Sequence, residues 1–363
     1  MISRILLILI GAMITESILA QTKSVFPSSV WRETSPERVG VDRVKLDSAI
    51  QHLESKFTDV GRNQLVIVRN GYVIFQGKDA GKIVNVYSVA KSLTSTVLGL
   101  AIHDKKLSLD DKAFIFFPSL KAQYPAVTIR HFTTMTSGYR GQNKTDLERL
   151  DINNPWELTP GKPIFEPGKA TMYSNDGMRM LSAILTKQAG VSLYDYFMKK
   201  VGKDIGITSL QWPVIDHVNN IPLCSGSDSV FSSALDLARI GLLYLNEGNW
   251  NGKQLIEKEW IKEATKVQVS NDIALKELPG WGDRIDGRGL YGFNWWVNNP
   301  MPDRYQYVKG APTDMYRAMG LMNNYLFVIP SWDMVIVKTG GDLSGNQIPV
   351  WSKFFEVLAS GVH

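Results

Sequence analysis

Residues 64–77 read Gln-Leu-Val-Ile-Val-Arg-Asn-Gly-Tyr-Val-Ile-Phe-Gln-Gly, and this stretch decides how the fold begins. Two runs rich in β-branched residues flank Asn70-Gly71, the strongest short-range signal of a β-hairpin. Late in the chain, residues 325–329 and 334–338 form two similar runs around a turn at 330–333. The sequence therefore predicts two hairpins, one from each end of the chain.

Helices are predicted between and after these hairpins. After Ser88, apolar residues recur at helical spacing up to about residue 103, which predicts an amphipathic helix. Further helices are predicted over about 176–189, closed by Gly190, over about 233–248 and over about 347–358. The fold class predicted is α+β, an α/β sandwich with one antiparallel sheet built from both chain ends and flanked by helices. The sheet lobe is expected over about 31–106 and 226–363, with an inserted all-helical lobe over about 107–225.

Ser88-Val89-Ala90-Lys91 is the only Ser-x-x-Lys in the chain, and it opens the first of these helices. A serine hydroxyl needs a base within hydrogen-bond reach, and residues three apart share one face of a helix. A helix N-terminus favours an anion and disfavours an ammonium, so a partly buried Lys91 is expected to titrate low enough to act as that base. The backbone N–H of Ser88 is expected to face a developing oxyanion. The alternative is a chance match with Lys91 merely solvated.

Tyr173-Ser174-Asn175 stands just before the helix predicted from about residue 176. Taken alone, Asn175 fits a helix N-cap and Tyr173 fits a core aromatic residue. Beside Ser88 and Lys91, a phenol whose anion is stabilised by an ammonium can share one proton with the lysine and pass it from the serine to a leaving group. We therefore expect Tyr173 to join the site and Asn175 to orient Lys91 or the substrate.

Several further segments occur in an order that is typical of one superfamily. They are Ser35-Pro36-Glu37 with Val39-Gly40, Tyr87 to Ser92, Val127 to His131 with Thr136-Ser137-Gly138, Phe165 to Gly168 with Tyr173-Ser174-Asn175, Asp236 to Arg239, Asn251-Gly252-Lys253 and Tyr291-Gly292. The chain resembles the serine β-lactamase and penicillin-binding-protein superfamily, in its class C-like branch with family VIII esterases, D-aminopeptidases and 6-aminohexanoate-dimer hydrolases. The resemblance implies that Ser88 is the acylated nucleophile, Lys91 its base partner and Tyr173 a general base or acid.

The third motif departs from this resemblance. The family places Lys-Thr-Gly or His-x-Gly where this chain has Ala318-Met319-Gly320. The resemblance implies a backbone oxyanion donor near Gly320, which survives a change of side chains. The change of side chains removes the cation that binds a substrate carboxylate in the family. This favours neutral esters or amides as substrates. A literal Lys338-Thr339-Gly340 closes the following strand and is interpreted as a coincidence.

The N-terminal residues are typical of a secretory signal. Arg4 precedes ten apolar or small residues, and Ala20 is the expected cleavage point, which leaves a mature domain of 21–363 in the periplasm or secreted. The apolar stretch is shorter than the roughly 20 residues of a spanning helix, so no stable membrane insertion is expected after cleavage. With one cysteine, Cys224, an internal disulfide is excluded, and this residue is interpreted as a buried apolar side chain.

Other classes of function have little support. The net charge of +5 comes from scattered Lys and Arg, which argues against a nucleic-acid partner. The five histidines lie far apart, so a zinc site is not expected, and His131 is interpreted as a helix-start or core residue. Acyl-enzyme chemistry on a serine needs neither a metal nor a cofactor, so none is expected. No Gly-x-Ser-x-Gly elbow occurs. An aromatic cluster fits a pocket lining and a core equally well; it comprises Trp281, Tyr291, Phe293, Trp295 and Trp296. No pattern indicates an oligomeric state.

The sequence thus predicts a serine hydrolase that cleaves a small ester or amide through an acyl-enzyme, with Ser88, Lys91 and Tyr173 catalytic and with Asn175 and Gly320 at the substrate. Two alternatives stay open. One is a penicillin-binding or sensor-type protein that is acylated without turnover. The other is a D-amino-acid peptidase that acts on peptidoglycan fragments.

Overall fold

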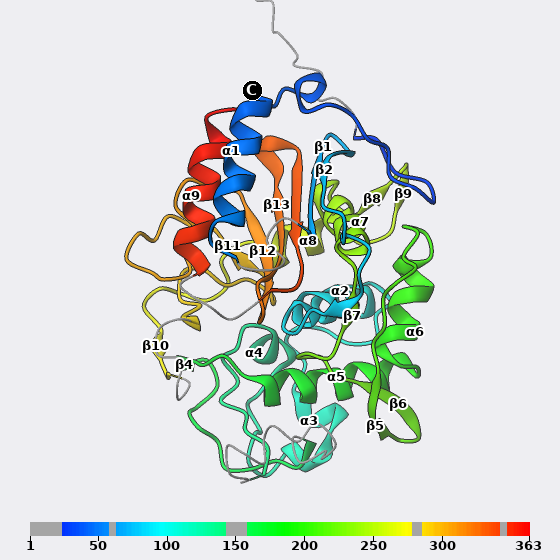
Figure 1. Cartoon of the computed structure of the whole chain (residues 1–363). Coiled ribbons are helices and arrows are strands. Elements are labelled where there is room, and N and C mark those ends of the chain that lie inside the picture. The colour runs from blue at the N-terminus through cyan, green and yellow to red at the C-terminus, as the bar shows by residue number, and fades with distance from the viewer. Residues whose placement is uncertain (1–23, 58–62, 143–157, 278–284, 342–346) are drawn as a thin grey trace, which may run out of the picture.

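The computed structural model describes residues 24–57, 63–142, 158–277, 285–341 and 347–363. Its main sheet is antiparallel, with six strands in the order β11-β12-β13-β14-β1-β2 (Figure 1). Their bounds are β11 Trp296–Val297, β12 Tyr316–Gly320, β13 Asn324–Ile329, β14 Met334–Lys338, β1 Leu65–Arg69 and β2 Tyr72–Gln76. Strands from both ends of the chain therefore meet at the β14–β1 pair, as predicted.

The helices and the short strands complete the fold. The helices are α1 Arg43–Glu54, α2 Val89–His103, α3 Ala113–Phe116, α4 Ile129–Thr133, α5 Asn175–Ala189, α6 Leu193–Phe197, α7 Ala234–Leu245, α8 Lys258–Ala264 and α9 Gln347–Ala359. The short strand pairs are β3 Val84–Asn85 with β7 Phe231–Ser232, β4 Ala170–Thr171 with β10 Ala274–Leu275, β5 Val214–Val218 with β6 Ile221–Cys224, and β8 Asn249–Trp250 with β9 Lys253–Gln254.

Each face of the sheet is covered by a different set of helices. Side chains alternate between faces along a strand, so Leu65 and Ile67 pack with α1 and α9, while Val66 and Val68 join the other core. Figure 1 shows α1 and α9 side by side on one face and α7 behind the other. The strands are apolar on both faces because both are covered. The predicted α+β sandwich is therefore confirmed.

Both predicted hairpins form, and the first depends on its turn. Asn70 and Gly71 both have positive φ, at 52° and 79°, the conformation that a tight hairpin turn requires. A Cβ on Gly71 would also lie 1.8 Å from the Val25 carbonyl oxygen, so the turn has no room for a side chain.

The insertion between the sheet segments holds α3 to α6, seen in the lower half of Figure 1. It differs from an all-helical lobe because β5 and β6 form a hairpin within it. Its turn residues Asn219 and Asn220 have φ values of 50° and 63°. Asparagine tolerates this conformation well, so the Asn-Asn pair is the signal for the hairpin that the sequence analysis did not use.

Helix α2 lies between the lobes and contacts α5, α6 and β12. The sequence predicts an amphipathic helix, but every residue over 89–101 is buried. Its polar side chains are short, and Thr94 and Thr96 donate hydrogen bonds to the carbonyls four residues earlier, at 3.0 and 3.1 Å. These two hydroxyls therefore find hydrogen-bond acceptors within the helix itself. Among the helices that the structure describes, none is both long and apolar enough to cross a membrane.

Candidate active site

Ser88 stands at the N-cap of α2, in the turn that leaves β3. The preceding residue, Tyr87, has a φ of 47°, an uncommon conformation for a bulky side chain. Asn85 holds this turn, because its Oδ1 accepts a hydrogen bond of 2.9 Å from the Tyr87 N–H. The Ser88 side chain does not cap the helix. Its hydroxyl is instead turned toward Lys91.

Lys91 is 1% exposed and donates hydrogen bonds to three acceptors. Its Nζ lies 3.0 Å from Ser88 Oγ, 2.8 Å from Asn175 Oδ1 and 2.8 Å from the Ser227 carbonyl oxygen. Burial lowers the pKa of Lys91 to about 7, although Asp228 nearby raises it. The amine is therefore held beside the serine and can lose its proton near neutral pH.

Tyr173 meets both groups from the other lobe. Lys91 Nζ lies 4.6 Å from the Tyr173 ring centroid. Burial raises the pKa of the Tyr173 phenol well above its ordinary value, and the Ser88 side chain offsets this only in part. The phenol thus keeps its proton at neutral pH. The expected stabilisation of the phenolate is not seen, because burial raises the pKa of Tyr173.

Asn175 is the first residue of α5. Its interpretation as an N-cap is wrong, because Ser174 caps the helix and accepts a hydrogen bond of 3.0 Å from the Gly177 N–H. With the cap filled by its neighbour, the Asn175 amide is free to accept from Lys91.

Gly320 ends β12 directly beside the Ser88 turn. A Cβ on Gly320 would lie 2.2 Å from the Val86 carbonyl oxygen and 3.1 Å from the Ser88 nitrogen. Only glycine therefore allows the strand to approach so closely. Asn324 adds to this contact, since its Nδ2 donates to the Asn85 carbonyl oxygen at 3.2 Å.

The side chains of the third motif offer an apolar edge. Met319 is half-buried and Leu321 is 38% exposed. Lys338, from the literal Lys-Thr-Gly, ends β14 and places its ammonium over the Phe57 ring, in the core shared with α1 and α9. This placement agrees with its interpretation as a coincidence of letters.

The aromatic cluster lies in the core and contacts Tyr173. Trp296 stacks on Tyr173 with ring centroids 6.4 Å apart, and Tyr291 packs edge-on against Trp296. All four described members of the cluster are buried in one core, where Trp295 also contacts Tyr244. The cluster therefore supports Tyr173 from behind, and Trp281 lies outside the described residues.

His131 and Cys224 have structural roles, as predicted. His131 Nδ1 accepts a hydrogen bond of 3.1 Å from the Thr128 N–H in a capping box that starts α4. Cys224 is buried, which raises the pKa of its thiol to about 11. Within the described ranges, no group of three or more His, Cys, Asp or Glu side chains gathers as a metal site.

Sequence reasoning missed Arg179, Ser227 and Asp228, which surround Lys91 from behind. The Ser227 carbonyl accepts from Lys91, and the charges of Arg179 and Asp228 both act on its pKa. The available signal was the run Ser-Gly-Ser-Asp-Ser at 225–229, an unusual density of hydroxyls around one carboxylate.

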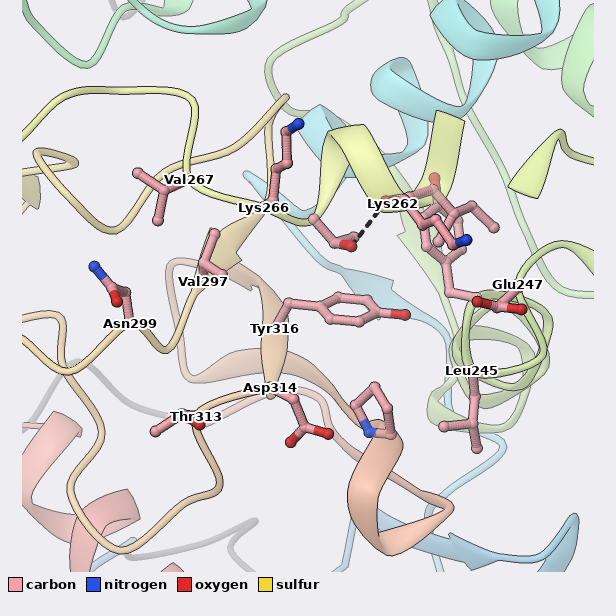
Figure 2. Close-up of a pocket in the computed structure, with 14 residues that line it drawn as sticks. Leu245, Glu247, Lys262, Lys266, Val267, Val297, Asn299, Thr313, Asp314 and Tyr316 are labelled. Atoms are coloured by element: carbon pink, nitrogen blue, oxygen red, sulfur yellow. Dashed lines mark hydrogen bonds between the residues drawn. The ribbon is translucent and has the colours of Figure 1, made fainter. Parts of the chain in front are cut away.

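A cavity of about 390 Å³ lies elsewhere, between the ends of α7 and α8 and strands β11 and β12 (Figure 2). Lys262, Lys266, Glu247 and Asp314 stand around it, with Tyr316 in its wall. None of the five predicted site residues lines this cavity. It is therefore separate from the chemistry around Ser88.

Comparison with known proteins agrees with this geometry. A sequence profile of the beta-lactamase family matches residues 57–339. The matched segment includes Ser88, Lys91, Tyr173, Asn175 and Gly320. The chain therefore belongs to the beta-lactamase family, a family of serine hydrolases.

Several solved structures share the fold. A putative beta-lactamase from Bacteroides dorei superimposes with a TM-score of 0.68 at 18% identity, covering 88% of this chain and 99% of that one. A putative 6-aminohexanoate-dimer hydrolase from Bacillus anthracis gives 0.65 at 19% identity, covering 84% and 79%. A family VIII carboxylesterase gives 0.64 at 14% identity, covering 87% and 96%. At these identities the likeness is one of fold.

Proposed function

We propose that this protein hydrolyses a small neutral ester or amide through an acyl-enzyme formed on Ser88. The observation that carries the proposal is the convergence of three groups that lie far apart in the sequence: Lys91 Nζ lies 3.0 Å from Ser88 Oγ and 4.6 Å from the Tyr173 ring centroid. A nucleophile with a base and an acid in contact is the arrangement that acyl transfer requires.

The first step is acylation. Neutral Lys91 accepts the hydroxyl proton as Ser88 Oγ attacks the substrate carbonyl carbon. The oxygen of that carbonyl gains negative charge and is stabilised by backbone N–H groups at Ser88 and near Gly320. Tyr173 donates its proton to the leaving group as the bond to the carbonyl carbon breaks, and Lys91 returns a proton to the phenolate. The result is an acylated Ser88 and a released alcohol or amine.

Deacylation repeats the proton transfers with water as the nucleophile. Neutral Lys91 accepts a proton from water, and the oxygen of that water attacks the ester carbonyl. Ser88 Oγ leaves and regains its proton. The products are a carboxylic acid and the free enzyme, and neither step needs a metal or a cofactor.

The substrate class follows from the third motif. Ala318, which is buried, stands where the family has the Lys or His that binds a carboxylate. A neutral acyl group is therefore favoured over a penicillin-like anion. The ester and amide chemistry named for two structural neighbours supports the same range of substrates. From the N-terminal pattern, we place this activity in the periplasm or outside the cell.

The test compares Ser88→Ala with Ser95→Ala in the same helix. Within the described part of the chain, the buried Ser95 Oγ has no hydrogen-bond partner, so its removal breaks nothing. We expect Ser88→Ala to abolish p-nitrophenyl acetate hydrolysis and fluorophosphonate labelling, and Ser95→Ala to keep both. Activity that survives in Ser88→Ala contradicts the proposal. A burst without steady turnover in the wild type would favour the acylated, non-turnover alternative.

A further inference from the structure

A polar loop between β6 and β7 lies directly behind the lysine. It comprises residues 225–229, and its Ser227 carbonyl oxygen accepts from Lys91 at 2.8 Å. The next residue, Asp228, accepts hydrogen bonds from Ser225 Oγ at 2.8 Å, Ser227 Oγ at 3.0 Å and Ser229 Oγ at 2.9 Å. The loop is therefore tied together around one carboxylate.

Arg179 connects this loop to α5. Its Nη2 lies 3.4 Å from Asp228 Oδ2, and its Nε lies 3.4 Å from Ser227 Oγ. Arg179 is 5% exposed and stands four residues after Asn175, on the same face of the helix. One face of α5 thus carries two groups that act on Lys91. Asn175 accepts a hydrogen bond from Lys91, and Arg179 holds the loop whose Ser227 carbonyl also accepts from Lys91.

The pair is a poor device for stability alone. Burying two charges costs free energy that their attraction often fails to recover, and apolar residues of similar size commonly do as well. The location of the ion pair points to a role at Lys91. Of the described titratable or charged groups that act on this lysine and its neighbour, Tyr173 lies in front with Tyr291 beyond it, and Arg179 and Asp228 lie behind. Besides burial, Asp228 raises the pKa of Lys91 and Arg179 lowers it.

We propose that Asp228 and Arg179 are positioning residues of the site: their partly buried ion pair holds the Ser227 carbonyl against Lys91 and places two opposing charges behind its amine. The inference rests on the proposed function, because the ion pair is assigned the role of adjusting the protonation of Lys91, the base that activates Ser88. Neither residue touches the reacting atoms.

The experiment measures kcat/KM for p-nitrophenyl acetate against pH in the wild type, Asp228→Asn and Arg179→Gln. The acidic limb reports the loss of a proton from Lys91. Removing the carboxylate makes the ammonium less favourable, so we expect Asp228→Asn to move the limb to lower pH by about one unit. Removing the guanidinium has the opposite sign, so Arg179→Gln is expected to move it to higher pH. A merely structural defect does not produce shifts of opposite sign.

Two kinds of control accompany these variants. Asp228→Glu and Arg179→Lys keep the charges and are expected to keep the limb near its wild-type position. Asp236→Asn makes the same carboxylate-to-amide change at another buried site, where Asp236 accepts from the Thr208 and Ser209 N–H groups at 2.9 and 2.5 Å. Its limb is expected not to move.

The inference is overturned if the acidic limbs of Asp228→Asn and Arg179→Gln coincide with that of the wild type. It is also overturned if both limbs move in the same direction. If only one variant folds, the sign of its shift still decides. If neither folds, the pair serves stability and the inference is wrong. If the wild type is not acylated at Ser88, the proposed function fails first, whereas acylation with unmoved limbs rejects the positioning role alone.

Discussion

At the scale of single residues, the site separates the roles of two titratable groups by their surroundings. Burial disfavours the charged form of Lys91, so its pKa falls to about 7. Burial also disfavours the phenolate of Tyr173, so the pKa of that phenol rises. Opposite shifts of this kind assign the base and the acid. At neutral pH a substantial fraction of the resting sites therefore holds an uncharged lysine ready to accept a proton and a phenol ready to donate one.

The lysine pKa predicts the acidic limb of the activity. We expect kcat/KM for p-nitrophenyl acetate to rise with pH through about 7, because the free amine is the active form. Below that point, activity is expected to fall about tenfold for each pH unit. Initial rates from pH 5 to 9 check this, and a flat profile down to pH 5 would contradict Lys91 as the base.

The raised phenol pKa predicts a leaving-group effect in Tyr173→Phe. The variant keeps the ring beside Lys91 but loses the proton donor, which is commonly worth about 10²- to 10⁴-fold in rate. An anilide needs that proton and is expected to lose most, while a p-nitrophenyl ester, whose leaving group departs as an anion, is expected to lose least. Comparing kcat/KM for the two substrates measures this, and equal losses would remove Tyr173 from the acid role.

Sequence identified the residues that touch the reacting serine but not those behind them. Ser88 and Lys91 are close in sequence, and Tyr173 with Asn175 forms a recognisable motif. Arg179 and Asp228 have no local signature, because their effect depends on a helix and a loop that meet only in the folded chain. The same limit applies to the pKa of Tyr173, because the burial that raises it cannot be predicted from the adjacent residues in the sequence.

At the scale of elements, the site depends on β12 reaching the turn before α2. The contact is a backbone approach at Gly320, where a Cβ would lie 2.2 Å from the Val86 carbonyl oxygen. Runs of β-branched residues around turn residues predicted both hairpins, and helical periodicity predicted the main helices. It did not place the cap of α5 at Ser174 or find the β5–β6 hairpin, which single polar side chains decide.

The close approach predicts the effect of Gly320→Ala. The added methyl group must push β12 away from Ser88. We therefore expect kcat/KM to fall at least tenfold, which corresponds to about 1.4 kcal/mol in the activation free energy. The loss of folding stability is expected to be smaller. Gly81→Ala is the matched control, since nothing lies within 4 Å of its Cβ position. Ester hydrolysis and thermal unfolding of both variants are the measurements. Wild-type activity in Gly320→Ala would show that β12 does not shape the site.

At the scale of the whole molecule, the first and last helices close one face of a sheet drawn from both ends of the chain. Trp351 on α9 is fully buried against Phe327 of β13, with ring centroids 4.6 Å apart. This layer lies on the opposite face from the core that contains α2. The architecture could be predicted because strands occur at the chain ends and helices in the middle, whereas the lobe contacts could not.

This separation predicts that Trp351→Ala affects stability rather than chemistry. Truncating a buried tryptophan commonly costs about 3–5 kcal/mol, and we expect that loss in urea unfolding. The kcat/KM of the remaining folded fraction is expected to stay near the wild-type value. Lys353→Ala, on the exposed side of the same helix, should change stability by less than about 0.5 kcal/mol. A selective loss of activity in folded Trp351→Ala would contradict this division of roles.

The central claim is that Ser88 carries the acyl group during turnover. The most direct measurement is acid quenching of the enzyme within milliseconds of mixing with p-nitrophenyl acetate, followed by peptide mass mapping. The account predicts one acetyl group on the peptide that contains Ser88, disappearing as substrate is exhausted and absent from Ser88→Ala. An acetyl group on another residue, or hydrolysis with no acylated peptide at any time, would contradict it.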